Sequence, residues 1–390
     1  MVYNRVMSLC FALAFFFCAV ARASHTIPRS IYVEGGKFHV QGVVYDSIRH
    51  HFYFSFTTRL VKTDEQGKVL GTVDNIQGHL GDLAFNPKDG TVYASLECKD
   101  DEIGSSIVRK LKAGSTAAES HKFYVAVFDG NKINRPDMDA SADGVMKAAY
   151  IAEASHDYQA AAPLGATAVA HRYGCSGIDG VTVAPQPGSR GGKPCLVVAY
   201  GIYGDTLRTD NDCQVLLCYS LEDVERTAHA VRWDSLHTSG PRHLQHKLFV
   251  RTGNTRYGVQ NLAYDPFTHL CFMAVYKGQK REFPNYPLFA ARWTAKPHRA
   301  MLPSGYNATK KVEMLPLADA GLRDEATGVR GWNFPYGSTG FFPLGGGLYY
   351  ISHNGRTPEG KQYCRLQLYR WTGDAVQPFE LCTPLSGNSR

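Results

Sequence analysis

Three acidic side chains and one histidine in this sequence have the types and spacing that acid–base chemistry needs. Asp82 and Asp179 each stand within two residues of a small residue that recurs along the chain. Glu97 ends the apolar run that follows Asp82, and His79 lies three residues before Asp82. Two carboxyl groups facing one ligand can work as general acid and base on a glycosidic bond. The sequence therefore predicts four catalytic residues, namely Asp82, Asp179, Glu97 and His79.

Each of these residues also has an alternative role. Carboxylates bind Ca²⁺, which prefers oxygen ligands, so calcium is a candidate cofactor or stabilising ion. Residues 139–144 resemble the start of a calcium loop, but Tyr150 stands where such a loop has its bidentate acid. His79 can carry protons near neutral pH, or it can simply be a hydrogen-bonded histidine. The sequence contains no GxSxG elbow, no HExxH and no phosphate-binding glycine loop.

The candidate residues belong to a segment that recurs five times, at 41–47, 80–87, 176–183, 260–266 and 339–343. Each copy is followed by short runs rich in β-branched and aromatic residues, such as 91–97, 123–129 and 146–153 after the second copy. Five groups of four short strands indicate an all-β fold. We predict a five-bladed β-propeller with four-stranded antiparallel blades around a central channel. A double-sheet sandwich or two β-domains is the alternative.

Two runs are predicted to complete particular blades. Residues 310–316 read as the fourth strand of the fourth group, and 379–382 as that of the fifth. The N-terminal run Ser30–Glu34 is predicted to close one blade as its outermost strand.

The first strand of each propeller blade lines the channel, and its start faces the channel mouth. Polar residues beside the recurrent small residue then point toward one another, where a ligand or an ion can bind. On this basis we predict that a ligand contacts Gln41, Ser176, Gln260, Asn261 and Thr339. The alternative is that these side chains only hydrogen-bond one another and ordered water.

Three loop clusters combine aromatic rings with polar side chains, within 200–212, 280–286 and 330–336. Aromatic faces together with carboxylates suit sugar binding, whereas a solvated acidic turn is the alternative for the first cluster. The ligand-binding residues predicted in these clusters and beside the repeat are Tyr200, Tyr203, Asp205, Arg208, Tyr257, Asn285, Asn333, Tyr336 and His353.

The first residues predict export. Arg5 is followed by an apolar run at 9–20 and by Ala21-Arg22-Ala23, a form that signal peptidase cuts. We therefore predict a signal peptide at 1–23, a single β-propeller domain at 24–390, a secreted or periplasmic location and no stable membrane insertion. Eight cysteines follow residue 23, and an even number in an exported protein permits disulfides. Small buried thiols are the alternative.

The charge pattern bears on the partner. The formal net charge is +7, and the basic residues are scattered rather than gathered in the stripe that nucleic-acid binding needs. We predict a small molecule or a glycan as ligand and no nucleic acid as partner.

Three stretches, HRYGCSGIDGV (171–181), AYGIYGDTLRTDND (199–212) and GNTRYGVQNLAYDP (253–266), resemble exported bacterial five-bladed β-propeller proteins of unassigned activity. The resemblance covers roughly residues 38–372. It implies the fold and export but supplies no catalytic residue. Five-bladed propellers include glycoside hydrolases, nucleotidases and lectins. The hydrolase pattern of one acid in each of the first three blades is met by Asp82 and Asp179, whereas the first blade offers Gln41.

These patterns together predict a secreted β-propeller with a polar site in its central channel. The leading hypothesis is a hydrolase or lyase that acts on a carbohydrate-like ligand. The rival hypothesis is a non-enzymatic propeller, stabilised by calcium in one version, that binds a glycan or a peptide through its aromatic loops.

Overall fold

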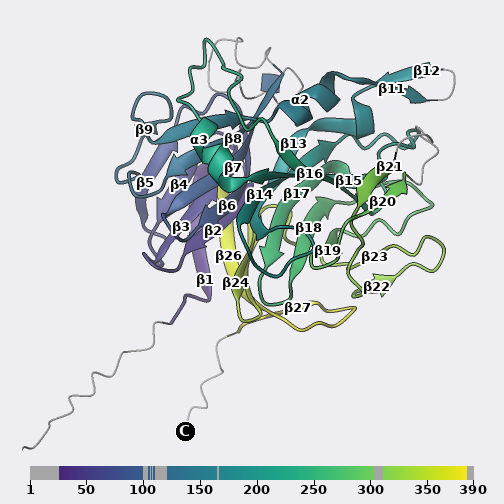
Figure 1. The fold of residues 1–390 in the computed structure, drawn as a ribbon. Coiled ribbons are helices and arrows are strands. Elements are labelled where there is room, and N and C mark those ends of the chain that lie inside the picture. The colour runs from purple at the N-terminus through teal and green to yellow at the C-terminus, as the bar shows by residue number, and fades with distance from the viewer. Residues whose placement is uncertain are drawn as a thin grey trace, which may run out of the picture.

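The computed structural model describes residues 26–99, 104, 105, 107, 109, 121–164, 167–302 and 311–383. The predicted signal peptide at 1–23 lies outside these residues. The fold is all-β, and most of its strands are gathered in five mainly antiparallel sheets that form the blades of a propeller (Figure 1). The sequence prediction of a five-bladed β-propeller is confirmed.

The first two blades have four antiparallel strands each. Blade 1 consists of β2 (Gly42–Asp46), β3 (His51–Ser55), β4 (Leu60–Thr63) and β5 (Val69–Asp74), with the short β9 (Met138–Asp139) parallel to β5. Blade 2 consists of β6 (His79–Asn86), β7 (Thr91–Cys98), β8 (Lys122–Asp129) and β10 (Met146–Tyr150).

The other three blades differ in how their outer edges are built. Blade 3 has β13 (Cys175–Pro185), β14 (Pro194–Ile202), β15 (Cys213–Ser220), β16 (Leu244–Arg251), β21 (Lys311–Met314) and β20 (His298–Met301). Blade 4 has β17 (Arg256–Asp265), β18 (Leu270–Tyr276) and β19 (Leu288–Arg292). Blade 5 has β24 (Phe341–Gly345), β25 (Leu348–Arg356), β26 (Gln362–Trp371), β1 (Ser30–Gly36) and β27 (Phe379–Leu381).

Two observations show that the five blades close into a ring. Around the axis each inner strand contacts the next, in the order β2, β6, β13, β17, β24 and back to β2. Five separate clusters of buried apolar side chains also fill the five spaces between neighbouring blades. Because both faces of a blade are covered, its strands are buried almost throughout, as in β6 and β13. The alternative of separate β-domains is excluded.

The prediction for the outer strand of blade 4 was wrong. Residues 311–314 form β21, which pairs parallel with β16 of blade 3 and antiparallel with β20. Val312 and Met314 of this strand pack into the apolar cluster that also holds Phe249 of β16, and burial of these side chains draws the strand to blade 3. The edge of β19 is covered instead by isolated bridges from Trp332 and Leu317.

The prediction that the N-terminal run closes a blade is confirmed. Strand β1 pairs antiparallel with residues 362–367 of β26, and β27 pairs with residues 369–371 of the same strand. The last blade therefore contains strands from both ends of the described chain, which ties the ring together.

The predicted disulfides are not formed. All eight cysteines after residue 23 are free thiols, and seven of them are buried in the sheets as small apolar side chains. Burial raises the pKa of Cys98, Cys213 and Cys364 to about 12. These thiols are therefore unreactive at neutral pH.

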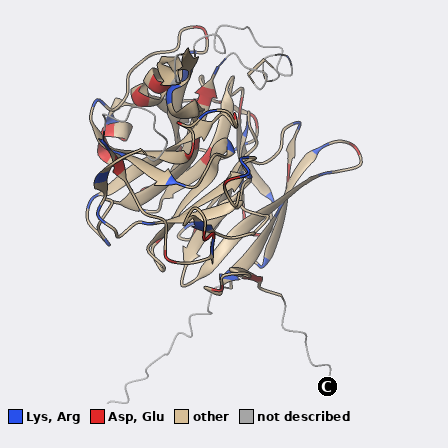
Figure 2. Cartoon of the chain, turned by 90° about the vertical axis from the view of Figure 1, so that its right-hand side faces the viewer, with Lys and Arg blue, Asp and Glu red and all other residues tan. Residues whose placement is uncertain are grey.

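The few helices are short and lie outside the blades. Among the described residues they include α2 (Ala152–Gln159) and α3 (Leu221–Thr227), with a single turn, η2 (Arg172–Gly174). Two hairpins also lie outside the five blades, β11 (Ala161–Leu164) with β12 (Thr167–Ala170) and β22 (Leu322–Arg323) with β23 (Arg330–Gly331). Within the described residues, no helix has the length and apolarity to cross a membrane. Basic and acidic residues are both scattered along the ribbon (Figure 2).

Candidate functional site

A cavity of about 540 Å³ lies at the channel mouth, where the inner strands begin. Blades 1 to 4 contribute to its wall. The lining residues are Phe38, His39, Gln41, Thr57, His79, Glu97, Lys99, Ile107, Ser176, Asp179, Gly201, Tyr257, Gln260 and Tyr276. The predicted residues His79, Glu97 and Asp179 thus share one cavity, whose volume suits a small ligand.

His79, Glu97 and Lys99 form a charged group on blade 2. His79 and Glu97 are cross-strand neighbours of β6 and β7, and the His79 Nδ1 atom lies 3.5 Å from Glu97 Oε2. Since alternate residues of a strand share a face, Lys99 follows Glu97 on the same side. The Lys99 Nζ atom lies 2.9 Å from Glu97 Oε2 and donates to the Ser176 carbonyl at 2.7 Å.

The charges in this group shift the pKa values of Glu97 and His79 in opposite directions. Burial alone would raise the pKa of Glu97, but Lys99 and His79 outweigh it and lower this pKa below its usual range. Burial alone would lower the pKa of His79, but the hydrogen bond to Glu97 and the charges of Asp179 and Glu97 outweigh it and raise this pKa. Glu97 is consequently a fixed carboxylate, and His79 is held toward its cationic form.

β-Bulges in three inner strands set which side chains reach the cavity. The register shifts between Leu80 and Leu83 in β6, between Ile178 and Val181 in β13, and between Val259 and Asn261 in β17. Gly81, Asp179 and Gln260 therefore occupy equivalent positions, and Asp82, Gly180 and Asn261 occupy the next one. A bulge re-aims a side chain and is common beside functional sites.

Two glycines leave open the space that the Asp179 and Glu97 carboxylates occupy. A Cβ atom on Gly81 would overlap Asp179 Oδ1, and a Cβ atom on Gly177, whose φ is +131°, would overlap Glu97 Oε1. The recurrent small residue thus makes room for a carboxylate from a neighbouring blade.

The environment of Asp179 is typical of a proton-transfer group. Its side chain is buried, at 7% exposure, and its Oδ1 atom has no hydrogen-bond partner among the described residues. Burial is the main cause that raises the pKa of Asp179 to about 7, with Glu97 adding to it and His79 and Lys99 opposing it. At neutral pH the carboxyl is therefore about half protonated.

Asp82, by contrast, does not line the cavity and binds backbone. Its Oδ2 atom accepts from Val181 N at 2.9 Å and from Leu262 N at 2.8 Å, and its Oδ1 atom accepts from Leu83 N at 2.8 Å. Burial raises the pKa of Asp82 well above the usual range, while these three N–H groups oppose the rise. The carboxyl thus joins the inner strands of blades 2, 3 and 4 across the axis.

The predicted polar ligand contacts are divided in the same way. Gln41, Ser176 and Gln260 line the cavity. Asn261 lies deeper, and its amide donates to the Gln41 carbonyl at 2.7 Å. The Thr339 hydroxyl donates to Ser352 Oγ at 3.3 Å on blade 5 and is not among the cavity-lining residues.

Two tyrosines form an aromatic side of the cavity. Tyr257 is 47% exposed, and its backbone φ of +65° is in the left-handed region, which is unfavourable for a tyrosine. Its ring packs edge-on against Tyr276, with centroids 6.2 Å apart. Strain of this kind is often kept where function needs it. Sequence reasoning identified Tyr257 but missed Tyr276 and Lys99, although alternation from Glu97 would have found Lys99.

In the first aromatic loop cluster, within 200–212, the buried side chains make contacts that hold the loop in place. Tyr200 is fully buried and donates to Asp157 Oδ2 at 2.9 Å, while Tyr203 packs against His171. Arg208 pairs with Asp210 at 2.8 Å and donates to the carbonyls of residues 170 and 171. Asp205 is exposed and caps its own turn through Leu207 N. These four residues do not line the cavity.

The remaining predicted contacts lie at other places. The Asn285 amide donates to the carbonyls of Lys280 and Phe283 and holds its own loop. Asn333 is exposed. The rings of Tyr336 and His353 stack with centroids 3.9 Å apart on blade 5, and His353 bonds the Tyr369 hydroxyl at 2.9 Å. These side chains are not part of the cavity wall.

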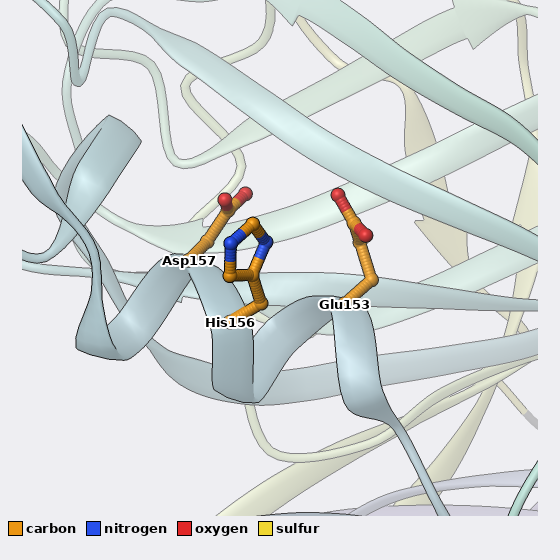
Figure 3. Close-up of side chains that lie close together, drawn as sticks. All are labelled: Glu153, His156 and Asp157. Carbon is orange, nitrogen blue, oxygen red and sulfur yellow. The ribbon is translucent and has the colours of Figure 1, made fainter.

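In two acidic clusters outside the channel, the carboxylates form hydrogen bonds or ion pairs with other residues of the chain. In the 139–144 loop, Asp139 Oδ1 accepts from the backbone of Ser141 and Ala142 at 2.8 Å, and Asp143 pairs with Arg135. Figure 3 shows Glu153, His156 and Asp157, whose ligand atoms lie within 4.8 Å of one another on α2.

The side chains of Lys247 and Arg172 already pair with the carboxylates of this α2 cluster. Lys247 pairs with Glu153 at 2.7 Å and also with Asp157, and Arg172 donates to Asp157 at 2.7 Å. Because the carboxylate charges are neutralised, the arrangement joins α2 to β16 and does not fit a metal centre.

The chain matches no family model, and no curated protein resembles it in sequence. Among solved structures it is similar to a functionally unknown protein from Desulfotomaculum acetoxidans DSM 771, with 10% identity and a TM-score of 0.32, over 89% of this chain and 69% of that one. A likeness this weak carries no argument, so the assignment of the fold depends on the closed ring of five sheets.

Proposed function

We propose that the channel mouth is the active site of a hydrolase or lyase that acts on a carbohydrate-like ligand, with Asp179 as the proton donor. The observation that carries the proposal is the buried Asp179 carboxyl, with an unpartnered oxygen and a pKa of about 7, in a cavity that also holds a fixed carboxylate. Neighbouring carboxyls whose pKa values move apart are the usual basis of acid and base roles.

In this proposal each side chain has one task. Protonated Asp179 gives its proton to the leaving oxygen as the glycosidic C–O bond breaks, and the Glu97 carboxylate stabilises the positive charge that develops on the ring. A water molecule then bonds to the ring carbon and gives its proton to the Asp179 carboxylate, which restores the acid. His79 is the second proton carrier, and Lys99 is a positioning residue that fixes Glu97. The exposed ring of Tyr257 offers a face for the sugar.

The experiment is a comparison of native protein with Asp179→Asn on a panel of polysaccharides and aryl glycosides, assayed for release of reducing ends or unsaturated product. Native turnover that falls at least 100-fold in Asp179→Asn, with unchanged melting temperature, supports the proposal. A native protein that turns over no member of the panel, or an equally active variant, contradicts it. Asp205→Asn is the matched control, because Asp205 is exposed and outside the cavity.

A second candidate is a non-enzymatic binding propeller. The observation that favours it is the engagement of Glu97, whose Oε1 atom accepts from Ile178 N at 2.9 Å while Oε2 faces Lys99 and His79. A carboxylate held on both oxygens is poorly placed to act as a nucleophile. Glycan binding by calorimetry without any turnover would favour this candidate.

A further inference from the structure

In three blades, a serine of the second strand lies opposite the recurrent glycine of the first strand. The pairs are Ser55 with Gly42, Ser95 with Gly81 and Ser352 with Gly340. All three serines are buried. Ser95 is the residue of β7 that faces the two bulged residues of β6, Gly81 and Asp82. The same position can therefore be compared in three blades.

The three serine hydroxyls differ in their partners. Ser55 Oγ donates to the Gly81 carbonyl at 2.6 Å, and Ser352 Oγ accepts from the Thr339 hydroxyl at 3.3 Å. The fully buried Ser95 Oγ has no hydrogen-bond partner within the described residues. A buried hydroxyl without a partner costs free energy and is rare in folded proteins. Since the fold provides a partner at this position in blades 1 and 5, the unpartnered hydroxyl of blade 2 requires its own explanation.

The Ser95 hydroxyl lies beside the Asp179 carboxyl of the neighbouring blade. A Cβ atom on Gly81 would come within 2.4 Å of Ser95 Oγ and within 2.3 Å of Asp179 Oδ1, so the two oxygens border the same space. Asp179 Oδ1 is also buried and without a partner within the described residues. A hydroxyl can donate to a carboxyl oxygen, and hydrogen bonds of active sites often become well aligned only when a ligand binds.

From this shared space at Gly81, we propose that Ser95 is a positioning residue for Asp179, with its hydroxyl donating to Oδ1 so that the transferable proton is on Oδ2. This inference rests on the proposed hydrolase or lyase function and names a residue that prepares its acid. A donor at Oδ1 uses the lone pairs that a proton on this oxygen would need. Because a carboxylate accepts a stronger hydrogen bond than a neutral carboxyl, the same hydroxyl also favours release of the proton to the ligand.

Other titratable groups face Asp179 and remain the same in the serine variants. They are His79 and Asp82 from β6, Glu97 from β7, Lys99 just beyond β7 and Tyr276 from β18. A difference between native protein and Ser95→Ala therefore reports the hydroxyl alone.

The first test is a ¹³C NMR titration of the Asp179 carboxyl in the full-length protein, with its signal identified by loss in Asp179→Asn. In Ser95→Ala the carboxylate loses a donor, so we expect the pKa of Asp179 to rise by about 1, a change of about tenfold in proton affinity. Ser352→Ala is the matched control, because it removes a buried hydroxyl from the equivalent position outside the cavity. It should leave this titration unchanged.

The second test is Gly81→Ala, which fills the shared space without removing a polar group. The backbone of Gly81 is not in the left-handed region, and the atoms that a new methyl group would overlap are the ends of the Ser95 and Asp179 side chains. We expect kcat on a turned-over glycan to fall about tenfold or more in both Gly81→Ala and Ser95→Ala, with KM nearly unchanged. Unchanged melting temperatures show that both variants are folded.

Each result supports or overturns one claim. An unchanged or lower pKa of Asp179 in Ser95→Ala overturns the inference, and so does an equal rise in Ser352→Ala. Full kcat in Ser95→Ala, on a glycan that the native protein turns over, also overturns it. A raised pKa in Ser95→Ala without turnover of any glycan by native protein supports the contact between Ser95 and Asp179 and overturns the proposed hydrolase or lyase function instead.

Discussion

Glu97 and Lys99 form an ion pair of 2.9 Å at the channel mouth, and both side chains are 94% buried. A buried pair is strongly destabilised when one partner is removed, since the other charge then has no compensation. We expect Lys99→Met to lower the free energy of unfolding by about 3 kcal/mol in urea titrations. Adding Glu97→Gln to this variant should recover part of the loss, and a loss that is no smaller in the double variant would contradict the pairing.

Asp82 and Asp179 should respond differently to the same change. In Asp82→Asn one carboxylate oxygen is replaced by a donor that faces backbone N–H groups, so we expect a loss of about 3 kcal/mol in unfolding free energy. Asp179→Asn should cost little, because its Oδ1 atom has no partner among the described residues. Equal losses in the two variants would show that the bulge positions do not separate their roles.

The titration of Asp179 makes stability depend on pH. Its folded pKa of about 7 lies above the usual 3.8, so the folded state keeps a proton that the unfolded state releases between these values. Stability should fall as pH rises through this window, by at most about 1.4 kcal/mol per unit, and level off above it. Urea titrations from pH 4 to 8 check this. In Asp179→Asn the dependence should be smaller, and an identical pH profile would disprove it.

Tyr257 and Tyr173 offer a matched comparison, because both precede a glycine and both have a positive φ, of 65° and 60°. Tyr173 is 7% exposed and packs against Phe249, so Tyr173→Gly should cost about 3 kcal/mol or more. Tyr257→Gly relieves strain and exposes no core, so unfolding free energy should change by less than about 1 kcal/mol. A large loss at Tyr257 would show that its ring is structural.

Removal of divalent cations tests the calcium alternative. Because Lys247 and Arg172 neutralise the α2 carboxylates and the 139–144 loop bonds itself, chelator should leave the melting temperature unchanged. Differential scanning fluorimetry with and without EDTA measures this. A drop of several degrees, reversed by added Ca²⁺, would point to an ion site that these contacts do not explain.

The sequence by itself determined the architecture. Strand-forming runs in five groups, the small residue that starts each inner strand and the N-terminal run Ser30–Glu34 are local signals, and they predicted five blades and the closing strand β1. They also predicted His79, Asp82 and Asp179 near the channel, because residues that start inner strands must converge, and of these three His79 and Asp179 line the cavity. The run at 311–314 was misplaced, since strand propensity does not say which sheet edge has an apolar surface left to cover.

Only the tertiary structure decided which aspartate faces the cavity. Both follow the recurrent small residue, and the sequence cannot show that the bulges of β6 and β13 put Gly81 level with Asp179 and Asp82 level with Gly180. The side chain at the first bulge position faces the cavity, and the side chain at the next position faces the backbone of neighbouring strands. This difference of one residue makes Asp179 a half-protonated acid in the cavity and Asp82 a structural acid. Likewise, burial and partners distant in sequence determine that the cysteines are buried thiols, that Tyr200 bonds Asp157 and that Lys99 contacts the cavity. No local sequence pattern predicts such contacts.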